Sequence, residues 1–394
     1  MDFALTPEQE QFARDFENYL RAEMPQEVID DQHKEMMYPE SVACREFIRK
    51  MGRDGWLGVG WPKEYGGQGK SAIEQHLFYE IATYHKVPLP VLPLNTVGPA
   101  LMIFGTREQK DFFLPRILKG EMEISIGYTE PEAGSDLASL KTAAVRDGDE
   151  YVINGQKIFT TMAHTADYIW LAARTDPQAP KHKGISIFLV PADSPGISME
   201  PLYHLSGERS NATYYDDVRV PKNALVGEEN QGWKILTAQL DFERIMVSPS
   251  SGTRRNIEDT MEWARNTEVD GRKVIERPWV KRRFTELLTE VEVLRLLNLQ
   301  VAWMISQGKV PFAEASMVKV YGSELYQRVN HSLLEIMGEF GQLQGESKWV
   351  PLRGRVEHSF RLELNFLFGG GAIEVQRDII AMAGLGMPHA SRPR

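Results

Sequence analysis

The chain has 394 residues, 42% of them hydrophobic, which is enough for two or three domains with substantial cores. Its 45 Lys and Arg residues against 55 Asp and Glu give a net charge of −10, which argues against nucleic acid or an anionic membrane as the main partner, because both favour basic surfaces. The single cysteine, Cys44, excludes an internal disulfide and, with no basic and apolar leader and no long apolar run, leads us to expect a cytoplasmic protein.

Residues 1–120 are predicted to form a helical domain. In LTPEQEQFARDF, Thr6 suits an N-cap, Pro7 suits the first helical position, and Gln9 can complete a capping box. Phe12 and Phe16 then follow the 3.6-residue period of a helix with one buried face. Three later segments have similar spacing, namely PESVACREFIRKMGRDG, AIEQHLFYEIATYH and TREQKDFFLPRILKG.

A loop rich in glycine and tryptophan, GWLGVGWPKEYGGQG, separates two of these helices. Its glycines resemble a dinucleotide-binding fingerprint only loosely. No strand enters the loop, and no crossover helix with an acidic partner follows it. We therefore expect a connecting loop here, without a nucleotide site of its own.

Residues 121–228 are predicted to form an antiparallel β-barrel. From about Glu121 the apolar period changes to two, as in strands. The strand-like runs include EISIGYTE, ADYIWLAARTD and GISIFLVPA, with Gly, Pro, Asn and Asp between the runs. The Asp-Gly pair in RDGDE predicts a hairpin. Several short strands at this spacing favour a small barrel or sandwich.

Residues 229–394 return to a helical period. The segment from Trp279 to Gln307 carries one apolar stripe, made of Val280, Phe284, Leu287, Val291, Leu294, Leu297, Val301 and Met304. The residues GKVPF break this helix, and a second stripe from Val318 to Ile336 marks the next one. Long helices joined by short loops indicate a bundle, so the chain is predicted to be an α+β multidomain protein.

Two segments of the β domain carry the most specific pattern. YTEPEAGSDL at 128–137 and NGQKIFTT at 154–161 resemble the acyl-CoA dehydrogenase family, whose helical, β-barrel and helical order is the one predicted above. The resemblance implies a C-terminal four-helix bundle and a bound FAD, whose isoalloxazine these two segments hold. The competing interpretation is that their Thr and Ser residues only form strands and turns.

The resemblance assigns the flavin contacts residue by residue. The cofactor-binding residues that it implies are Ile126, Tyr128, Thr129, Gly134, Ser135, Phe159 and Thr161. Tyr128 and Thr129 would meet the pyrimidine edge of the flavin, and Ser135 would reach the pyrophosphate. Phe159 would lie against the ring face, and Thr161 would hydrogen-bond near N5 and O4. Donors near the ring suit a flavin because they stabilise the charge that develops on reduction.

The stretch FGGGAIEVQR at 368–377 sets three glycines before an expected helix, at a cost of about 1 kcal/mol each relative to alanine. In most relatives this stretch carries the glutamate that removes the substrate's α-proton, and alignment on its QR puts Gly370 at that position. Glu243, in QLDFERIMVS, matches the alternative base position of the long-chain and isovaleryl branches. The other interpretation of Glu243 is a charged residue beside Arg244 on a solvated helix face.

The resemblance also implies a mechanism. The thioester carbonyl would accept hydrogen bonds from the Gly370 amide and a flavin ribityl hydroxyl, while Glu243 takes the α-proton and a β-hydride leaves for the flavin. The pKa of Glu243 should rise when the acyl chain expels water. Asp241 and Arg244 match positions that contact the pantetheine region. No metal is expected, because the histidines lack ligand spacing.

Two departures from the family pattern concern assembly. Relatives bind the ADP half of FAD with an R-x-x-F-G stretch and a Q-x-x-G-G stretch of a neighbouring subunit. Here residues 264–273 lack Phe-Gly, and Glu335 and Glu339 stand where Gln and Gly are expected. Because two carboxylates would repel a pyrophosphate, we expect a homologous second subunit to supply these groups.

This pattern resembles the subunit with the catalytic glutamate in bacterial α2β2 steroid side-chain acyl-CoA dehydrogenases, as do VGWPKEYGG, ADYIWLAARTDP and KHKGISIFLV. The resemblance implies a steroid-CoA substrate with a shortened side chain, and an electron-transfer flavoprotein as acceptor. Two alternatives stay open. The chain could be a non-catalytic subunit that completes a partner's FAD site, or an acyl-CoA oxidase, whose reduced flavin would react rapidly with air.

Overall fold

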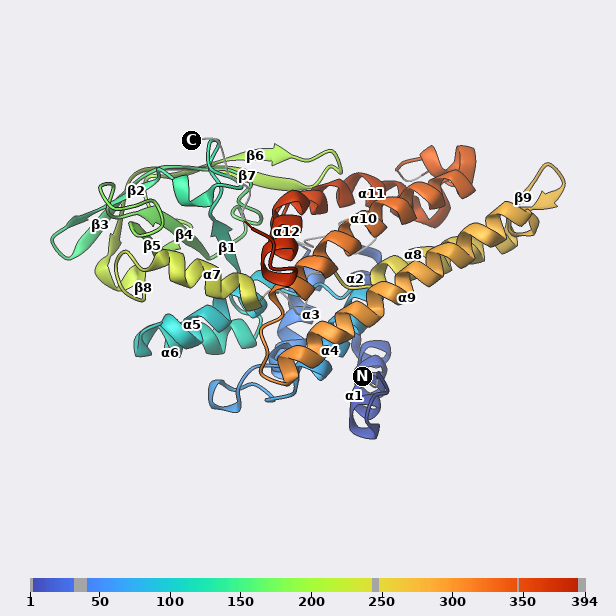
Figure 1. Cartoon of the computed structure of the whole chain (residues 1–394), viewed down its shortest axis with the longest axis horizontal. Coiled ribbons are helices and arrows are strands. Elements are labelled where there is room, and N and C mark those ends of the chain that lie inside the picture. The colour runs from blue at the N-terminus through green and yellow to red at the C-terminus, as the bar shows by residue number, and fades with distance from the viewer. Residues whose placement is uncertain (1–2, 32–40, 243–247, 346, 389–394) are drawn as a thin grey trace. The chain divides into compact units, whose positions relative to one another are not determined.

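The computed structural model describes residues 3–31, 41–242, 248–345 and 347–388 (Figure 1). The chain divides into two compact units that alternate along the sequence. The first unit combines Met1–Lys34, Ser71–Val87 and Arg244–Arg394, and the second combines Glu35–Lys70 and Pro88–Glu243. Because these units follow contacts and not chain order, the predicted domain limits at 120 and 228 stay predictions.

The first unit begins with the predicted capped helix. In α1 (Pro7–Glu23) the Thr6 side chain accepts a hydrogen bond from the Gln9 amide, and the Gln9 side chain accepts one from the Thr6 amide, so the capping box is confirmed. Phe16 is buried on this helix and meets Phe78 of α4 (Ala72–His85), with ring centroids 4.7 Å apart. The short helix α2 (Gln26–Asp31) lies between them in the chain.

Helices form the rest of the first unit, as predicted, and two of them have 29 and 26 residues. The main ones are α8 (Ser251–Asn266), α9 (Pro278–Ser306), α10 (Phe312–Met337), α11 (Arg355–Leu362) and α12 (Ile373–Ile379). Short elements connect them, namely β9 (Glu268–Val269), β10 (Arg272–Lys273), η7 (Val274–Glu276), η8 (Gly338–Gln342), η9 (Pro351–Gly354), η10 (Glu363–Leu367) and η11 (Ile380–Gly384).

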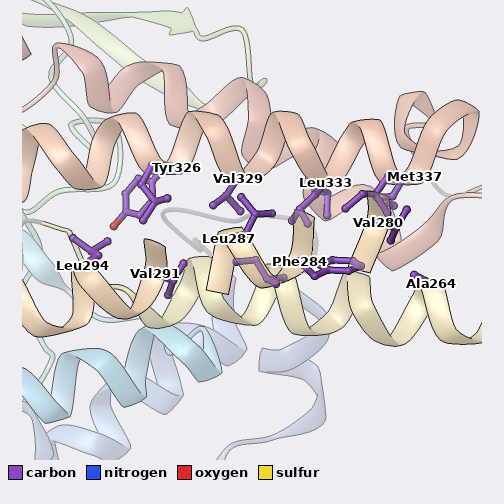
Figure 2. Packing of buried hydrophobic residues seen from close by; sticks show 14 of the residues in the cluster. Ala264, Val280, Phe284, Leu287, Val291, Leu294, Tyr326, Val329, Leu333 and Met337 are labelled. Carbon is purple, nitrogen blue, oxygen red and sulfur yellow. The ribbon is translucent and has the colours of Figure 1, made fainter. Parts of the chain in front are cut away.

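The core of this helical bundle lies between α8, α9 and α10 (Figure 2). From α9 it takes Phe284, Leu287 and Val291, all members of the stripe expected from the sequence. Opposite them lie Val329 and Leu333 of α10. Each such side chain contributes about 1.5–3 kcal/mol when it leaves water, so this seam holds the long helices together.

The second unit is built on one sheet of eight strands. Their order is β6-β7-β3-β2-β4-β5-β8, and β1 pairs with β4 outside this path. The strands are β1 (Ile124–Gly127), β2 (Ala143–Asp147), β3 (Glu150–Lys157), β4 (Tyr168–Arg174), β5 (Ile185–Pro191), β6 (Ile197–Tyr203), β7 (Arg209–Pro221) and β8 (Leu225–Val226). The predicted β domain is confirmed, and most of its pairs are antiparallel.

Two features of this sheet go beyond the predicted alternation. β1 and β2 run parallel to β4, a pairing that brings the end of β1 beside the centre of the sheet. The predicted hairpin joins β2 and β3, with Asp147 opposite Glu150 and Gly148 first in the two-residue turn. Gly148 has φ +63°, which a right-twisted hairpin needs at this turn position and glycine adopts without strain.

Helices accompany the sheet in the second unit. They are α3 (Val42–Arg53), α5 (Gly98–Phe104), α6 (Arg107–Leu118) and α7 (Gly232–Phe242), with the short turns η1 (Trp56–Gly58), η2 (Lys63–Tyr65), η3 (Pro93–Val97), η4 (Leu137–Ser139) and η5 (Lys222–Ala224). Trp61 of the Gly- and Trp-rich loop is buried, and its Nε1 donates to the Leu94 carbonyl over 3.0 Å, so the loop packs inside this unit. Among the helices of the described ranges, we find no candidate for a bilayer-crossing segment.

Candidate active site

The segment 128–137 continues directly from β1 in the second unit. Ile126 lies within β1, and a bridge between Glu130 and Ala133 closes the turn that follows, with both amide-to-carbonyl distances at 3.1 Å. Gly134 and Ser135 then lie exposed at the tip of the segment. A Cβ atom on Gly134 would meet no other atom within 4 Å, so this tip has room for a ligand.

A buried ion pair holds this segment on the sheet. Lys157, at the end of β3, is fully buried, and its Nζ lies 2.8 Å from Glu130 and donates to the Tyr128 carbonyl over 3.0 Å. Glu130 also accepts hydrogen bonds from the amides of Lys141 and Thr142 at 2.6 and 2.9 Å. Burial by itself would raise the pKa of Glu130, but Lys157 and these donors outweigh it and lower that pKa.

The Tyr128 side chain joins a buried polar cluster beneath the segment. Its hydroxyl donates to Gln239 Oε1 of α7 and accepts from Trp170 Nε1 of β4 over 2.8 Å. Trp170 Nε1 also donates to Gln239 Oε1 over 3.1 Å, and because an indole only donates, the Gln239 oxygen must face it. Gln239 Nε2 is buried and has no hydrogen-bond partner among the described residues. The NH2 group of this side chain is therefore available to donate to a ligand.

The second predicted flavin segment ends β3 and turns outward. Phe159 has φ +56° and is 55% exposed, although it is a large aromatic residue. Such a backbone conformation costs of order 1–3 kcal/mol outside glycine and is common at ligand sites. Thr161 is held by its carbonyl, which accepts from Ser125 of β1. This turn therefore carries Phe159 and Thr161 close to the strand that leads to Tyr128.

These features fit a flavin. An exposed aromatic ring on a strained backbone suits the face of an isoalloxazine. The leftover amide donor of Gln239 suits one of its polar atoms, and the open tip at Gly134 and Ser135 suits a phosphate. All of the predicted flavin residues therefore lie in the second unit, on β1, the segment after it and the turn after β3.

The triple glycine lies in the first unit, between η10 and α12. Gly370 and Gly371 have φ +69° and +105°, in the left-handed region that favours glycine. A Cβ on Gly370 would meet only Lys319 Nζ, at 3.9 Å, so space for a side chain exists there. The Gly370 amide makes no hydrogen bond to the described residues, which leaves it free to donate to a ligand.

One face of α10 fixes the connection from 363 to 371, which we call the glycine connection. Lys319 Nζ donates to the Gly369 carbonyl over 2.9 Å, and Ser323 Oγ donates to the Phe366 carbonyl over 2.9 Å. Asn330 Nδ2 donates to the Glu363 carboxyl, whose pKa burial raises well above its usual value. These three donors were not among the predicted site residues. The signal was polar residues at buried positions of the apolar stripe of the second long helix.

Models of one protein family match nearly the whole length of the chain. Models of the acyl-CoA dehydrogenase N-terminal, middle and C-terminal domains match residues 6–121, 125–218 and 230–385. Acyl-CoA dehydrogenase FadE26 of Mycobacterium tuberculosis is 46% identical over 406 residues, which cover 100% of both chains. The chain belongs to the acyl-CoA dehydrogenase family. Its activity is acyl-CoA dehydrogenation, and the predicted helical, β and helical order is confirmed.

Two solved structures of this family are similar over nearly the full chain. The Tcur3481-Tcur3483 steroid ACAD has a TM-score of 0.92 and 44% identity, and covers 99% of this chain and 100% of its own. The ChsE4-ChsE5 complex from Mycobacterium tuberculosis has a TM-score of 0.91 and 45% identity, with the same coverage. Each structure is named after two proteins, and the second is described as a complex.

Glu243, which is the predicted base, lies outside the described residues, and so does Arg244. Asp241 lies in the last turn of α7, where the structure describes the backbone. The catalytic role of Glu243 and the substrate contacts of Asp241 and Arg244 therefore stay predictions. Gly370 is described, and its conformation and available amide are compatible with the role expected for it.

The two stretches that depart from the ADP-binding pattern are both described. Residues 264–273 span the end of α8 and the hairpin of β9 and β10. Glu335 is exposed on α10, with its carboxylate 3.7 Å from His331, and Glu339 is exposed in η8. Both carboxylates are thus at the surface, where a pyrophosphate held by the family pattern would meet negative charge.

Proposed function

We propose that this acyl-CoA dehydrogenase is the base-carrying subunit of a heteromeric enzyme that oxidises a steroid-CoA with a shortened side chain. The observation that carries the proposal is Gly370, a left-handed glycine with an available amide, at the position that the family resemblance assigns to the base. A glycine cannot accept a proton, so the carboxylate must come from elsewhere. Glu243 is the candidate, because its position matches the alternative base of other branches.

In this proposal the chain's own residues polarise the substrate and remove one proton. The Gly370 amide donates to the thioester carbonyl oxygen, and this bond strengthens as negative charge develops there. A Glu243 oxygen takes the α-proton, which the polarised carbonyl has made more acidic. FAD, when bound, supplies the acceptor for the hydride that leaves the β-carbon.

The residues that would hold FAD come from the second unit. Phe159 would cover one face of the ring, while Thr129 and Thr161 would offer hydrogen bonds to its polar edge. Gly134 and Ser135 would accommodate the pyrophosphate, because the tip of that segment is open. The Glu130–Lys157 pair would hold these groups in position, because Lys157 also donates to the Tyr128 carbonyl.

Three observations support a second, different subunit. Glu335 and Glu339 are exposed and place negative charge where relatives bind a pyrophosphate. A shallow groove on α9 exposes apolar groups along one face, lined by Thr285, Leu288, Thr289, Glu292, Val293 and Leu296. Among the similar structures, one is a complex of ChsE4 with ChsE5, at 45% identity.

The steroid part of the proposal rests on similarity. The structure named a steroid ACAD shares 44% of its residues and the fold of nearly the whole chain. Identity at this level does not by itself transfer a substrate, because the acyl cavity depends on a few side chains. Steady-state assays with steroid-CoA and fatty acyl-CoA substrates of several lengths would test it. A clear preference for fatty acyl-CoA would reject the steroid assignment.

Replacing Glu243 by Gln tests the base. The amide has nearly the same shape but cannot take a proton, so we expect turnover to fall at least 1000-fold with FAD occupancy unchanged. Glu374→Gln is the matched control, since Glu374 is an exposed carboxylate on α12, four residues after Gly370. We expect it to keep normal turnover.

The same experiment separates the alternatives. If Glu243→Gln retains activity, Glu243 is not the base, and the non-catalytic subunit becomes the better interpretation. If the reduced flavin of the parent enzyme reoxidises within seconds in air, the chain is an acyl-CoA oxidase, and the transfer to an electron-transfer flavoprotein is wrong.

A further inference from the structure

Lys319 is a buried cation whose position the proposed chemistry does not yet use. It is 5% exposed, in the N-terminal third of α10, and its Nζ donates to the Gly369 carbonyl over 2.9 Å. This hydrogen bond ties a side chain of α10 to the peptide unit that includes the Gly370 amide.

The acceptor of this hydrogen bond is informative. The carbonyl of Gly369 and the amide of Gly370 belong to the same planar peptide unit. A cation that withdraws electron density from the carbonyl oxygen makes the N–H of that unit a stronger donor, as in any chain of linked hydrogen bonds. Lys319 thus acts on the amide that is predicted to hold the thioester, from the opposite side of the peptide.

The surroundings of Lys319 keep it in this position. The Phe366 ring centroid lies 5.7 Å from Nζ, within the range of a cation–π contact. One turn further along α10, Ser323 donates to the Phe366 carbonyl and holds the same connection. The nearest atom to a Cβ built on Gly370 is again Lys319 Nζ. The cation is therefore fixed beside the glycine connection by groups from both elements.

We propose that Lys319 is a positioning residue that orients and polarises the 369–370 peptide, so that the Gly370 amide binds the thioester oxygen more strongly as it becomes negative. The proposal rests on the proposed function, because it assumes the Gly370 donor. It adds a residue that acts on the substrate through the 369–370 peptide. A donor at such an oxygen is typically worth about 100- to 1000-fold in rate, and linked polarisation changes a hydrogen bond by about 10–30%.

Lys319→Met tests the proposal, because methionine fills a similar volume without charge or donor. We expect turnover of the FAD-loaded enzyme, assembled with its partner subunit, to fall about two- to eightfold. Tyr321→Phe is the control. It removes a donor of α10 that bonds the Glu290 carbonyl of α9 over 3.1 Å, outside the glycine connection, and we expect it to keep turnover within about 1.5-fold.

The decisive readout is the carbonyl stretch of a bound thioester. A 13C=O-labelled acyl-CoA with sulfur in place of the β-carbon binds but cannot be dehydrogenated, and its stretching frequency falls when the carbonyl is polarised. In the parent enzyme and in Tyr321→Phe we expect the frequency to fall on binding. In Lys319→Met this fall should be smaller by about 10–30%, while the dissociation constant changes less than about threefold because the CoA part dominates binding.

The outcomes separate this inference from the function on which it rests. If the parent enzyme shows no fall in frequency, the Gly370 donor itself is wrong. If the fall is present and Lys319→Met preserves it in full, the donor stands and the role of Lys319 is wrong. Should Lys319→Met fail to assemble, Lys319→Gln keeps a neutral donor, and a frequency equal to that of the parent would overturn the role of the charge.

Discussion

At the scale of single residues, the buried pair of Glu130 and Lys157 connects stability with cofactor binding. Lys157 bonds both the Glu130 carboxylate and the Tyr128 carbonyl, so one ammonium fixes two points of the segment that carries the predicted flavin contacts. Removing one member of a buried pair leaves an uncompensated charge, which typically costs about 3–5 kcal/mol. The pair thus joins the segment 128–137, which contains Glu130, to the segment 154–161, which contains Lys157.

Glu130→Gln should therefore destabilise the second unit by about 3 kcal/mol and weaken FAD retention. Glu132→Gln is the matched control. Glu132 pairs with Lys141 at the surface, where an ion pair contributes about 0–1 kcal/mol. Thermal unfolding and flavin absorbance at pH 7 would measure both effects. Equal melting temperatures for the two variants would contradict the structural role of the buried pair.

The same pair predicts a pH dependence. The pKa of Glu130 in the folded chain lies below its ordinary value of 4.5, because the bonds from Lys157 and two amides outweigh burial. Its contribution is therefore complete above the unfolded value and is lost as the pH falls through the lower folded value. Since glutamine does not titrate, the difference in melting temperature between parent and Glu130→Gln should shrink on acidification below about pH 4.

Single residues also mark the limit of what the sequence predicts for the site. The segments with Tyr128 and Phe159 were identified from their motif, and the Gly370 conformation follows from the glycine run. Lys319, Trp170 and Gln239 were not identified. Their roles depend on contacts between residues 42 to 111 positions apart, and local periodicity reports only that such positions are buried.

At the scale of elements, α9 shows how one helix serves two surfaces. Val291 is 3% exposed in the bundle core, and Val293 is 42% exposed beside the shallow groove. The two valines are two positions apart, which turns them to different sides of a 3.6-residue helix. The inward face explains the stability of the first unit, and the outward face is available for another chain.

The two valines give a matched pair of substitutions. Val291→Ala should destabilise this chain by about 2 kcal/mol, because two methyl groups leave a well-packed core. Val293→Ala should change its stability by less than about 0.5 kcal/mol, because the side chain is already half in water. Thermal unfolding of the chain expressed without a partner measures the difference. A similar loss for both valines would mean that α9 is packed differently.

Elements with a long and regular pattern were predicted well. The helix expected from Trp279 to Gln307 is α9, and the Thr6 capping box begins α1 as expected. The parallel pairing of β1 with β4 was not expected, because strand alternation gives the faces of a strand but not its neighbour. This pairing matters for the site, since it places the end of β1 at the centre of the sheet.

At the scale of the whole molecule, the proposed heteromer depends on exposed features of the first unit. Val293→Asp places a charge in the apolar groove of α9, so it should weaken assembly with the partner subunit while leaving the fold of this chain intact. Val42→Asp is the control, at an exposed valine of α3 in the second unit. Size-exclusion chromatography of the co-expressed subunits measures both. A homotetramer with full FAD occupancy, formed by this chain alone, would reject the heteromer.

The alternation of the two compact units along the chain has an evolutionary consequence. The first unit is assembled from three separate stretches and the second from two. A single recombination breakpoint can therefore never transfer either unit intact between paralogous genes. Subunits that divide the labour of one enzyme would have to diverge by individual substitutions, such as loss of a carboxylate at one position and its gain at another, while exchange of a complete module is closed to them.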